Sequence, residues 1–250
     1  AYALDPDRPL LLYCVSQNRL AATASLFFDY YAHLARLLRP VLEEGAQLLV
    51  LGAERLPALT ALPHTQLAPP CQVDAFFAVL GASDVFLTDS LVSSLAYACF
   101  AGVPSVLLEN PFRAPEELPE AVRADITPAP NTLRTARIRH HLMRVARALR
   151  WYRGVVPGPH SIATHGVFPW VVFPFGLTEL REQADRTFAM APCYRSAPAW
   201  DVRKAREVVN HVLADGPVRT AMLHDMRAWA RIRMQHPTPH DALQSLCRGR

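Results

Sequence analysis

Residues 9–110 alternate short apolar runs with segments of helical periodicity, and this alternation constrains the fold more than any other feature of the chain. The runs have the length and composition of buried strands, and between them apolar residues recur at helical spacing. Strands that alternate with helices in this way form a parallel sheet covered on both faces. The sequence therefore predicts a doubly wound α/β fold. The expected strands are 9–15, 46–53, 64–72 including its loop, 83–89 and 103–110, and the expected helices are 21–45, 73–82 and 93–102.

The rhythm changes after residue 110, and we divide the chain there. Residues 1–110 are the expected core of the domain. Residues 111–170 begin with a proline-rich stretch and continue into an arginine-rich segment with apolar residues at helical spacing, so we read them as a basic helical insertion. Residues 171–250 end in two expected helices, which the break at Gly216-Pro217 separates.

Composition excludes several classes of protein. An apolar content of 51% and a charged content of 19% exclude a disordered chain. No apolar run approaches the roughly 18 residues of a membrane helix, so no transmembrane segment is expected. The sequence begins without Met or a leader, which indicates a trimmed start or a piece of a longer polypeptide. Neither a GxSxG motif nor a phosphate-binding P-loop occurs, which removes support for those hydrolase and nucleotidase classes.

Cysteine spacing and charge indicate a cytoplasmic protein. The five cysteines are odd in number and far apart, and no Cys/His spacing suits zinc, so we expect reduced, buried thiols and no metal. The net charge of +4 is carried almost entirely by arginine, with Lys204 the one lysine. We attribute this composition to a GC-rich bacterial genome and expect no specific nucleic-acid partner.

One strand-to-helix turn concentrates hydroxyl groups. Thr88, Ser90, Ser93 and Ser94 lie between an apolar strand and a helix, together with Asp89. The N-terminus of a helix presents free backbone N–H groups and the positive end of the helix dipole, so this turn suits a phosphate or another anion. The same residue types cap helices without any ligand, and capping is the alternative reading.

A second polar turn, Ser16-Gln17-Asn18-Arg19, follows the first expected strand. Right-handed crossovers place the carboxyl ends of parallel strands along one edge of a sheet, and ligands bind at that edge. We therefore expect this turn and the turn at 88–94 to face the same ligand.

The run from Asp84 through Gly102-Val103-Pro104 resembles the nucleotide-sugar-binding segment of GT-B glycosyltransferases. The family pattern is a strand, a Gly- or Ser-rich turn, Ser or Thr at the helix start, and then Ala-x-Gly-x-Pro with an apolar strand. The stretches 9–19, 43–54 and 66–84 resemble the first strand and phosphate loop, the second strand, and the base-receiving loop and helix of the same domain. Residues 188–227 resemble its closing strand and C-terminal helices. The resemblance implies a Rossmann-like donor domain, the C-terminal half of such an enzyme.

This resemblance implies a set of donor-binding residues, with the base at the loop Leu67–Cys71. Tyr97 stands where inverting members carry a Glu that holds the donor ribose, and Ser90-Leu91 stands where many members have Gly-Gly. The family's catalytic base comes from the other half of the enzyme, so we assign no catalytic residue. The residues expected at the donor site are Ser16, Gln17, Asn18, Arg19, Asp89, Ser90, Ser93, Ser94 and Tyr97.

The expected activity is transfer of a sugar from a UDP-, GDP- or dTDP-sugar to an unidentified acceptor. No cofactor or metal is required, because helix N–H groups and hydroxyls can neutralise the leaving pyrophosphate. The acceptor half is either removed or supplied by a second chain. Two alternatives stay open: a non-catalytic GT-B-like scaffold or activator, and a nucleotide-sugar epimerase.

Residues in the expected insertion have competing readings. The arginine-rich segment 132–154 suits a phosphate, RNA or membrane surface, and we favour a solvated amphipathic helix. His160 and His165 suit acid and base roles, and we favour plain surface positions. Trp170 suits a sugar platform, and we favour a place in the core.

Overall fold

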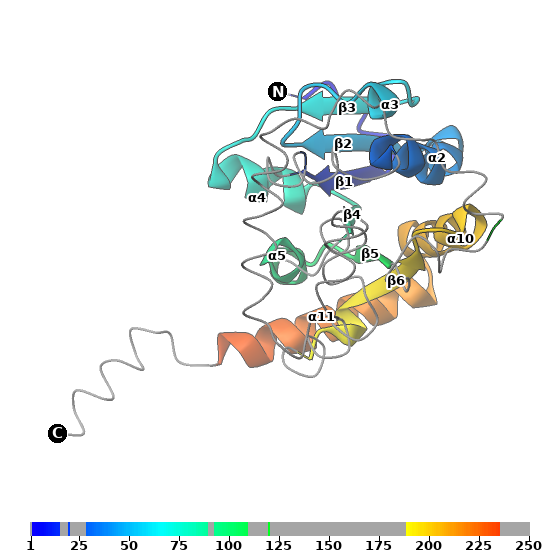
Figure 1. Ribbon diagram of the computed structural model, residues 1–250. Coiled ribbons are helices and arrows are strands. Elements are labelled where there is room, and N and C mark those ends of the chain that lie inside the picture. The colour runs from blue at the N-terminus through cyan, green and yellow to red at the C-terminus, as the bar shows by residue number, and fades with distance from the viewer. Residues whose placement is uncertain are drawn as a thin grey trace, which may run out of the picture.

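A single sheet of six parallel strands organises the described part of the chain (Figure 1), in the order β3-β2-β1-β4-β5-β6. The computed structural model describes residues 2–15, 20, 29–89, 93–109, 120 and 189–235. The expected doubly wound α/β fold is confirmed. The strands are β1 Leu10–Cys14, β2 Gln47–Leu51, β3 Thr65–Ala68, β4 Val85–Thr88, β5 Ser105–Glu109 and β6 Tyr194–Pro198.

The helices expected from the apolar periodicity of the sequence occur in the structure and cover the sheet. The expected helix 21–45 is described from Tyr30, and Asp29 caps it by accepting a hydrogen bond from the backbone N–H of Ala32 at 3.0 Å. The break at Gly216-Pro217 separates two helices as expected, with the proline in the first turn, where its missing N–H costs nothing. The helices are α2 Tyr30–Glu43, α3 Pro57–Thr60, α4 Val73–Gly81, α5 Ser93–Ala101, α10 Val202–Leu213 and α11 Pro217–Met234, with the 3₁₀ helix η3 Ala191–Cys193 before β6.

Two apolar cores lie on the two faces of the sheet, because successive side chains of a strand point to opposite faces. Leu11 and Tyr13 of β1 enter the larger core, which α2, α10 and α11 help to form. Leu10 and Leu12 enter the smaller core, to which α4 contributes Leu80. No described helix is long and apolar enough to span a membrane.

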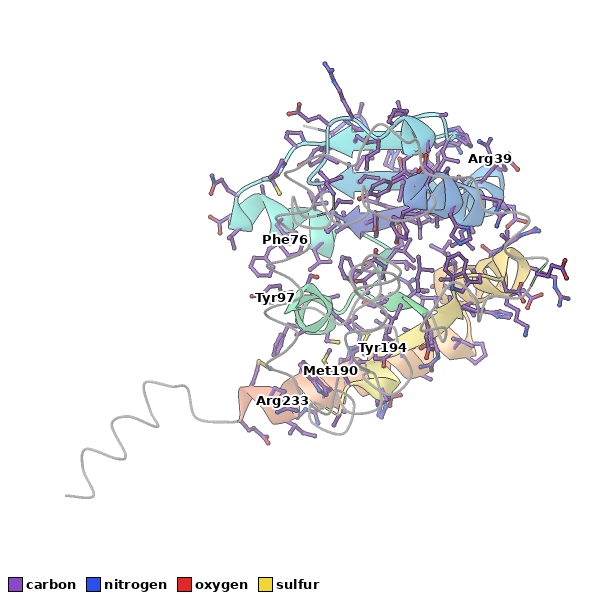
Figure 2. The ribbon with its side chains drawn as sticks, viewed as in Figure 1. Arg39, Phe76, Tyr97, Met190, Tyr194 and Arg233 are labelled. Atoms are coloured by element: carbon purple, nitrogen blue, oxygen red, sulfur yellow. The ribbon has the colours of Figure 1, made fainter. Side chains whose placement is uncertain are left out.

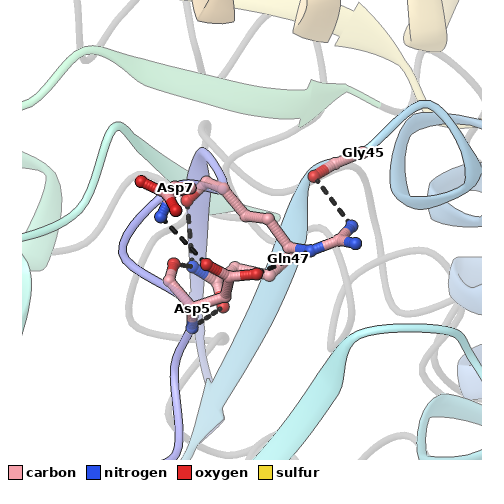
Figure 3. A network of polar contacts seen from close by, with 5 residues as sticks. Asp5, Asp7, Gly45 and Gln47 are labelled. Atoms are coloured by element: carbon pink, nitrogen blue, oxygen red, sulfur yellow. Dashed lines mark hydrogen bonds and ion pairs between the residues drawn. The ribbon is translucent and has the colours of Figure 1, made fainter.

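A polar network fastens the chain before β1 to the start of β2 (Figure 3). The buried side chain of Gln47 accepts a hydrogen bond from the backbone N–H of Asp5 at 3.0 Å and donates to the carbonyl oxygens of Asp5 and Arg8 at 2.6 and 2.9 Å. The Arg8 guanidinium donates to the carbonyl of Gly45 at 3.3 Å. The Oε1 atom of Gln47 thus has one donor and its Nε2 atom has two acceptors, so both ends of the amide group are hydrogen-bonded.

Replacing Gln47 by methionine is expected to lower the free energy of unfolding by about 2 kcal/mol, because two backbone carbonyls and one N–H lose their partner. Gln66 of β3 is the matched control, since its buried Oε1 has no hydrogen-bond partner. Gln66→Met should be neutral or slightly stabilising. Urea unfolding of both variants measures the difference, and equal losses would contradict the role of the network.

Candidate functional site

The predicted site lies where the strand order reverses. β1 and β4 are neighbours, with Leu11 opposite Val85 and Tyr13 opposite Leu87, but the chain continues from them to opposite sides of the sheet. In open α/β sheets the crevice at the carboxyl ends of two such strands is the usual place for a ligand. The structure therefore brings together the ends of the two strands that precede the predicted polar turns.

The described residues cover part of this predicted site. Ser16–Arg19 and Ser90 lie outside the described residues, and so does the side chain of Ser93. Asp89 directly follows β4, and α5 begins four residues later at Ser93, so the first turn of α5 starts at the same edge of the sheet. Ser94 is half-buried in that turn. The free N–H groups of the first turn are the donors on which the anion prediction depends.

Asp89 is the best-defined member of the site. It is buried, and one carboxylate oxygen, Oδ2, accepts hydrogen bonds from the hydroxyls of Tyr13 at 2.9 Å and Tyr30 at 2.6 Å. Both tyrosines are also buried, and their hydroxyls lie 3.5 Å apart. The three residues join the end of β4 to β1 and to the first turn of α2. Asp89 therefore fixes the strand ends that carry the two predicted turns.

Tyr97 lies on α5, on the side toward α4, and 41% of its surface is exposed. Its ring makes edge contacts with Phe77 at a centroid distance of 5.3 Å and with Phe76 at 6.4 Å. Figure 2 shows Phe76 and Tyr97 on the same side of the molecule. The position at which the GT-B resemblance predicts a carboxylate therefore carries, in this chain, a ring that belongs to an aromatic group.

Gly52 allows the end of β1 to approach the loop after β2. It adopts a φ of +101°, and a Cβ at this position would overlap the carbonyl oxygen of Val15. Its N–H donates to the carbonyl of Ala68 at 2.9 Å, as the neighbouring Ala53 does at 3.1 Å. Ala68 ends β3 and lies inside the predicted base loop, so the first two residues of that loop belong to the strand. Gly52 therefore ties the loop after β2 to the ends of β1 and β3.

His33 is a buried histidine of α2 that no expectation singled out as functional. Its Nε2 lies 2.6 Å from the carbonyl oxygen of Ala199, and its Nδ1 lies 3.4 Å from the Arg36 guanidinium. A carbonyl only accepts and a guanidinium only donates, so the imidazole is neutral with its proton on Nε2. Burial lowers the pKa of His33 to about 4, although the carbonyl of Ala199 acts in the opposite direction.

His33 is expected to make the fold less stable in acid. Between pH 6.5 and 4 the unfolded chain binds a proton that the folded chain does not, so the free energy of unfolding falls as the pH falls, by up to roughly 3 kcal/mol. His33→Gln keeps a donor for Ala199 and does not titrate, so it should lose this part of the pH dependence. Urea unfolding at several pH values measures it, with His211→Gln on the exposed side of α10 as control. Parallel pH curves for wild type and His33→Gln would refute the assignment.

The thiols of Cys14 and Cys99 lie in environments that disfavour the thiolate form. Burial, with Cys71 nearby, raises the pKa of Cys14 to about 12. A hydrogen bond with Cys193, followed by burial, raises the pKa of Cys99. Both groups are therefore thiols at neutral pH. Within the described residues, no three His, Cys, Asp or Glu side chains come together as a metal site.

A cavity of about 600 Å³ lies at the opposite edge of the sheet. Its lining includes Gln47 at the start of β2, Thr65 at the start of β3, and Arg8 from the chain before β1. It is therefore remote from the strand ends of the predicted site.

Sequence reasoning missed three residues of this site: Tyr13, Tyr30 and Gly52. Tyr13 and Tyr30 occupy apolar positions of an expected strand and helix, and the sequence indicated no polar role for them. Gly52 had a readable signal, because a glycine directly after an apolar strand often marks a close backbone approach. The expected groups within 111–170, namely the arginine-rich helix, His160, His165 and Trp170, lie outside the described residues.

Comparison with known proteins agrees with the fold. Residues 15–249 match the model of DUF6365, a family of unknown function. No curated protein is detectably similar in sequence. Among solved structures, the spinosyn forosaminyltransferase SpnP is 12% identical, with a TM-score of 0.50 and coverage of 97% of this chain and 44% of its own. This likeness confirms the expected Rossmann-like fold, which the chain shares with one half of that GT-B protein.

Two further solved structures are similar to this chain. The glycosyltransferase SnogD from Streptomyces nogalater is 14% identical, with 98% of this chain and 43% of that chain covered and a TM-score of 0.41. A UDP-GlcNAc 2-epimerase from Neisseria meningitidis is 12% identical, with 84% and 45% covered and a TM-score of 0.31. The chain spans less than half the length of each of these proteins.

Proposed function

Because the chain belongs to DUF6365, a family of unknown function, we propose its activity from the fold and the switch-point site: it binds a nucleoside-diphosphate sugar and serves in transfer of the sugar to an acceptor. The observation that carries this proposal is the meeting of the β1 and β4 ends at the reversal of strand order. α5 begins at Ser93, four residues after Asp89, which directly follows β4. The GT-B fold shared with SpnP, a forosaminyltransferase, supports the same class of substrate.

The proposed roles follow from the charges that a sugar transfer develops. The bond between the sugar and the diphosphate breaks, and negative charge grows on the leaving diphosphate. Backbone N–H groups of the first turn of α5, with the hydroxyls of Ser90, Ser93 and Ser94, stabilise that charge without a metal. Arg19, in the turn after β1, supplies a positive charge, and Ser16, Gln17 and Asn18 supply polar groups. Leu67–Cys71 receives the base.

Asp89 acts in this proposal as a positioning residue. Its carboxylate holds Tyr13 and Tyr30, and through them the ends of β1 and β4 stay in register. The group that deprotonates the acceptor is outside this proposal, since the chain spans less than half of the related enzymes. The acceptor, and a second chain that carries the acceptor half, are partners of the same proposal.

A scaffold without catalysis is the second candidate, and Tyr97 favours it. A phenol in contact with Phe77 does not offer the two carboxylate oxygens with which related enzymes hold a ribose. An epimerase of the same fold is the third reading from the sequence. It differs in outcome, because an epimerase changes the nucleotide sugar in the absence of any acceptor.

Nucleotide binding separates the two donor-binding readings, transferase and epimerase, from a scaffold that binds no nucleotide. Thermal unfolding with UDP, GDP and dTDP should show stabilisation by one of them, about 2 °C or more at a concentration well above Kd. Ser94→Ala should weaken that nucleotide about five- to tenfold in calorimetry, because one charge-assisted hydrogen bond is lost. Ser196→Ala on β6 is the control, since its buried hydroxyl has no partner and lies two strands away. Folded protein that none of the three nucleotides stabilises would rule out the donor-binding proposal.

A further inference from the structure

The exposed large apolar side chains of the described residues gather on three helices. Two come from α4, two from α5 and two from the end of α11, and they are 41–72% exposed. The largest apolar patch of a typical monomer is often functional. The six residues are Val73, Phe77, Tyr97, Phe100, Ile232 and Met234. We call this surface, together with the half-buried Phe76 and Trp229, the aromatic face.

Ring contacts connect the three helices across the aromatic face. Phe77 and Tyr97 join α4 to α5 at 5.3 Å, and Phe100 and Trp229 join α5 to α11 at 5.4 Å. Arg233 lies over the Trp229 ring at 5.5 Å. Figure 1 shows α5 between α4 and α11, and Figure 2 shows Phe76, Tyr97 and Arg233 in that order along one side of the molecule. The rings therefore lie in a row along α4, α5 and α11, with the two contact pairs meeting on α5.

α4 contains more apolar residues than the packing of its one buried residue accounts for. The helix reads VDAFFAVLG, yet Leu80 is its only buried residue. A helix that covers a sheet on one side normally carries polar residues on the other. Val73 and Phe77 occupy that outer side, with exposed fractions of 65% and 42%. The outer side of α4 therefore has the composition of a contact surface.

Charges at the two ends of the row are complementary. Asp74 lies on the exposed side of α4, one turn before Phe77. Arg233 lies at the far end of the row, one turn after Trp229 on α11. A two-fold axis through the centre of such a row places each end of one copy against the opposite end of the other copy. Opposite charges then face each other twice.

We propose that the aromatic face is the interface of a homodimer. The two-fold axis passes near Phe100 of α5, α4 of one copy lies against α11 of the other, and Asp74 faces Arg233 across the interface. Phenylalanine, tyrosine, tryptophan, methionine and arginine are the residues enriched in such interfaces; the aromatic face contains the first four, and Arg233 lies beside it over the Trp229 ring. The inference concerns a surface beyond the nucleotide-sugar proposal and does not depend on it.

Sedimentation equilibrium of the full chain tests the dimer. The wild-type protein should be dimeric at micromolar concentration, and Phe100→Glu should weaken association by about a hundredfold or more, because a charge enters the centre of the interface. Lys204→Glu on α10 is the control for a change of charge outside the face and should leave association unchanged. Circular dichroism and Tm confirm that each variant is folded.

A charge exchange distinguishes two copies of this chain from any other occupant. Asp74→Arg and Arg233→Glu should each weaken association about tenfold, since each creates two like-charge contacts. The double variant Asp74→Arg/Arg233→Glu should recover most of the wild-type affinity, because the pairs re-form with reversed sign. A wild-type monomer at all concentrations, a dimer that Phe100→Glu leaves intact, or a double variant weaker than both single variants would each overturn the proposal.

Discussion

Replacing Gly52 by alanine is expected to lower the free energy of unfolding by about 4 kcal/mol, one of the two largest effects of single substitutions in this fold. Two causes act together. The residue has a φ of +101°, where alanine is strained, and a Cβ would overlap the carbonyl oxygen of Val15. The overlapping atom belongs to the backbone of a buried segment, so it has little freedom to move away.

Gly45 is the matched control for Gly52. It has a φ of +113°, and a Cβ there would meet nothing within 4 Å. Gly45→Ala should therefore cost only the strain of the backbone, about 1 to 2 kcal/mol. Urea unfolding followed by circular dichroism compares the two variants. Losses of equal size would show that the close approach of Val15 contributes nothing, and would contradict the geometry at the end of β1.

The five strands expected between residues 9 and 110 all occur, and each lies inside its expected range. The reason is physical: β1 and β2 are buried on both faces, and such strands are continuous apolar runs that are visible without partners. β6 has a different pattern. It contains Arg195, Ser196 and Pro198, which are half-buried, and it is the last strand of the described sheet. Only the family resemblance indicated this edge strand.

The meeting of the β1 and β4 ends was predictable, whereas the side-chain contacts beside them were not. Polar turns after β1 and β4 are local patterns, and parallel topology alone brings them to one edge. The contacts of Asp89 join residues 59 and 76 positions apart, and nothing local in the sequence reports such a pairing. The sequence allowed Tyr97 to be compared only with a position of the GT-B family. Its ring contacts depend on how α4 packs beside α5. Local patterns identify turns, and packing decides which side chains meet.

Asp89→Ala is expected to lower the free energy of unfolding by about 3 to 5 kcal/mol. The substitution leaves the hydroxyls of Tyr13 and Tyr30 buried without their shared acceptor, and both lie in the larger core. Tyr30→Phe alone should cost about 1.5 to 3 kcal/mol, because a hydrogen bond to a charged group is lost. Urea unfolding measures all of these values.

A triple substitution separates the polar network from simple loss of packing. Asp89→Leu/Tyr13→Phe/Tyr30→Phe removes the carboxylate and both hydroxyls, so no buried polar group of the three is left unpaired. It should be more stable than Asp89→Leu alone, since a fully apolar cluster avoids the desolvation cost of unpaired groups. A triple variant as unstable as the sum of its single changes would show that the three groups act independently. Because the network joins β1, β4 and α2, recovery of stability without recovery of nucleotide binding would assign the carboxylate to the ligand site as well as to the fold.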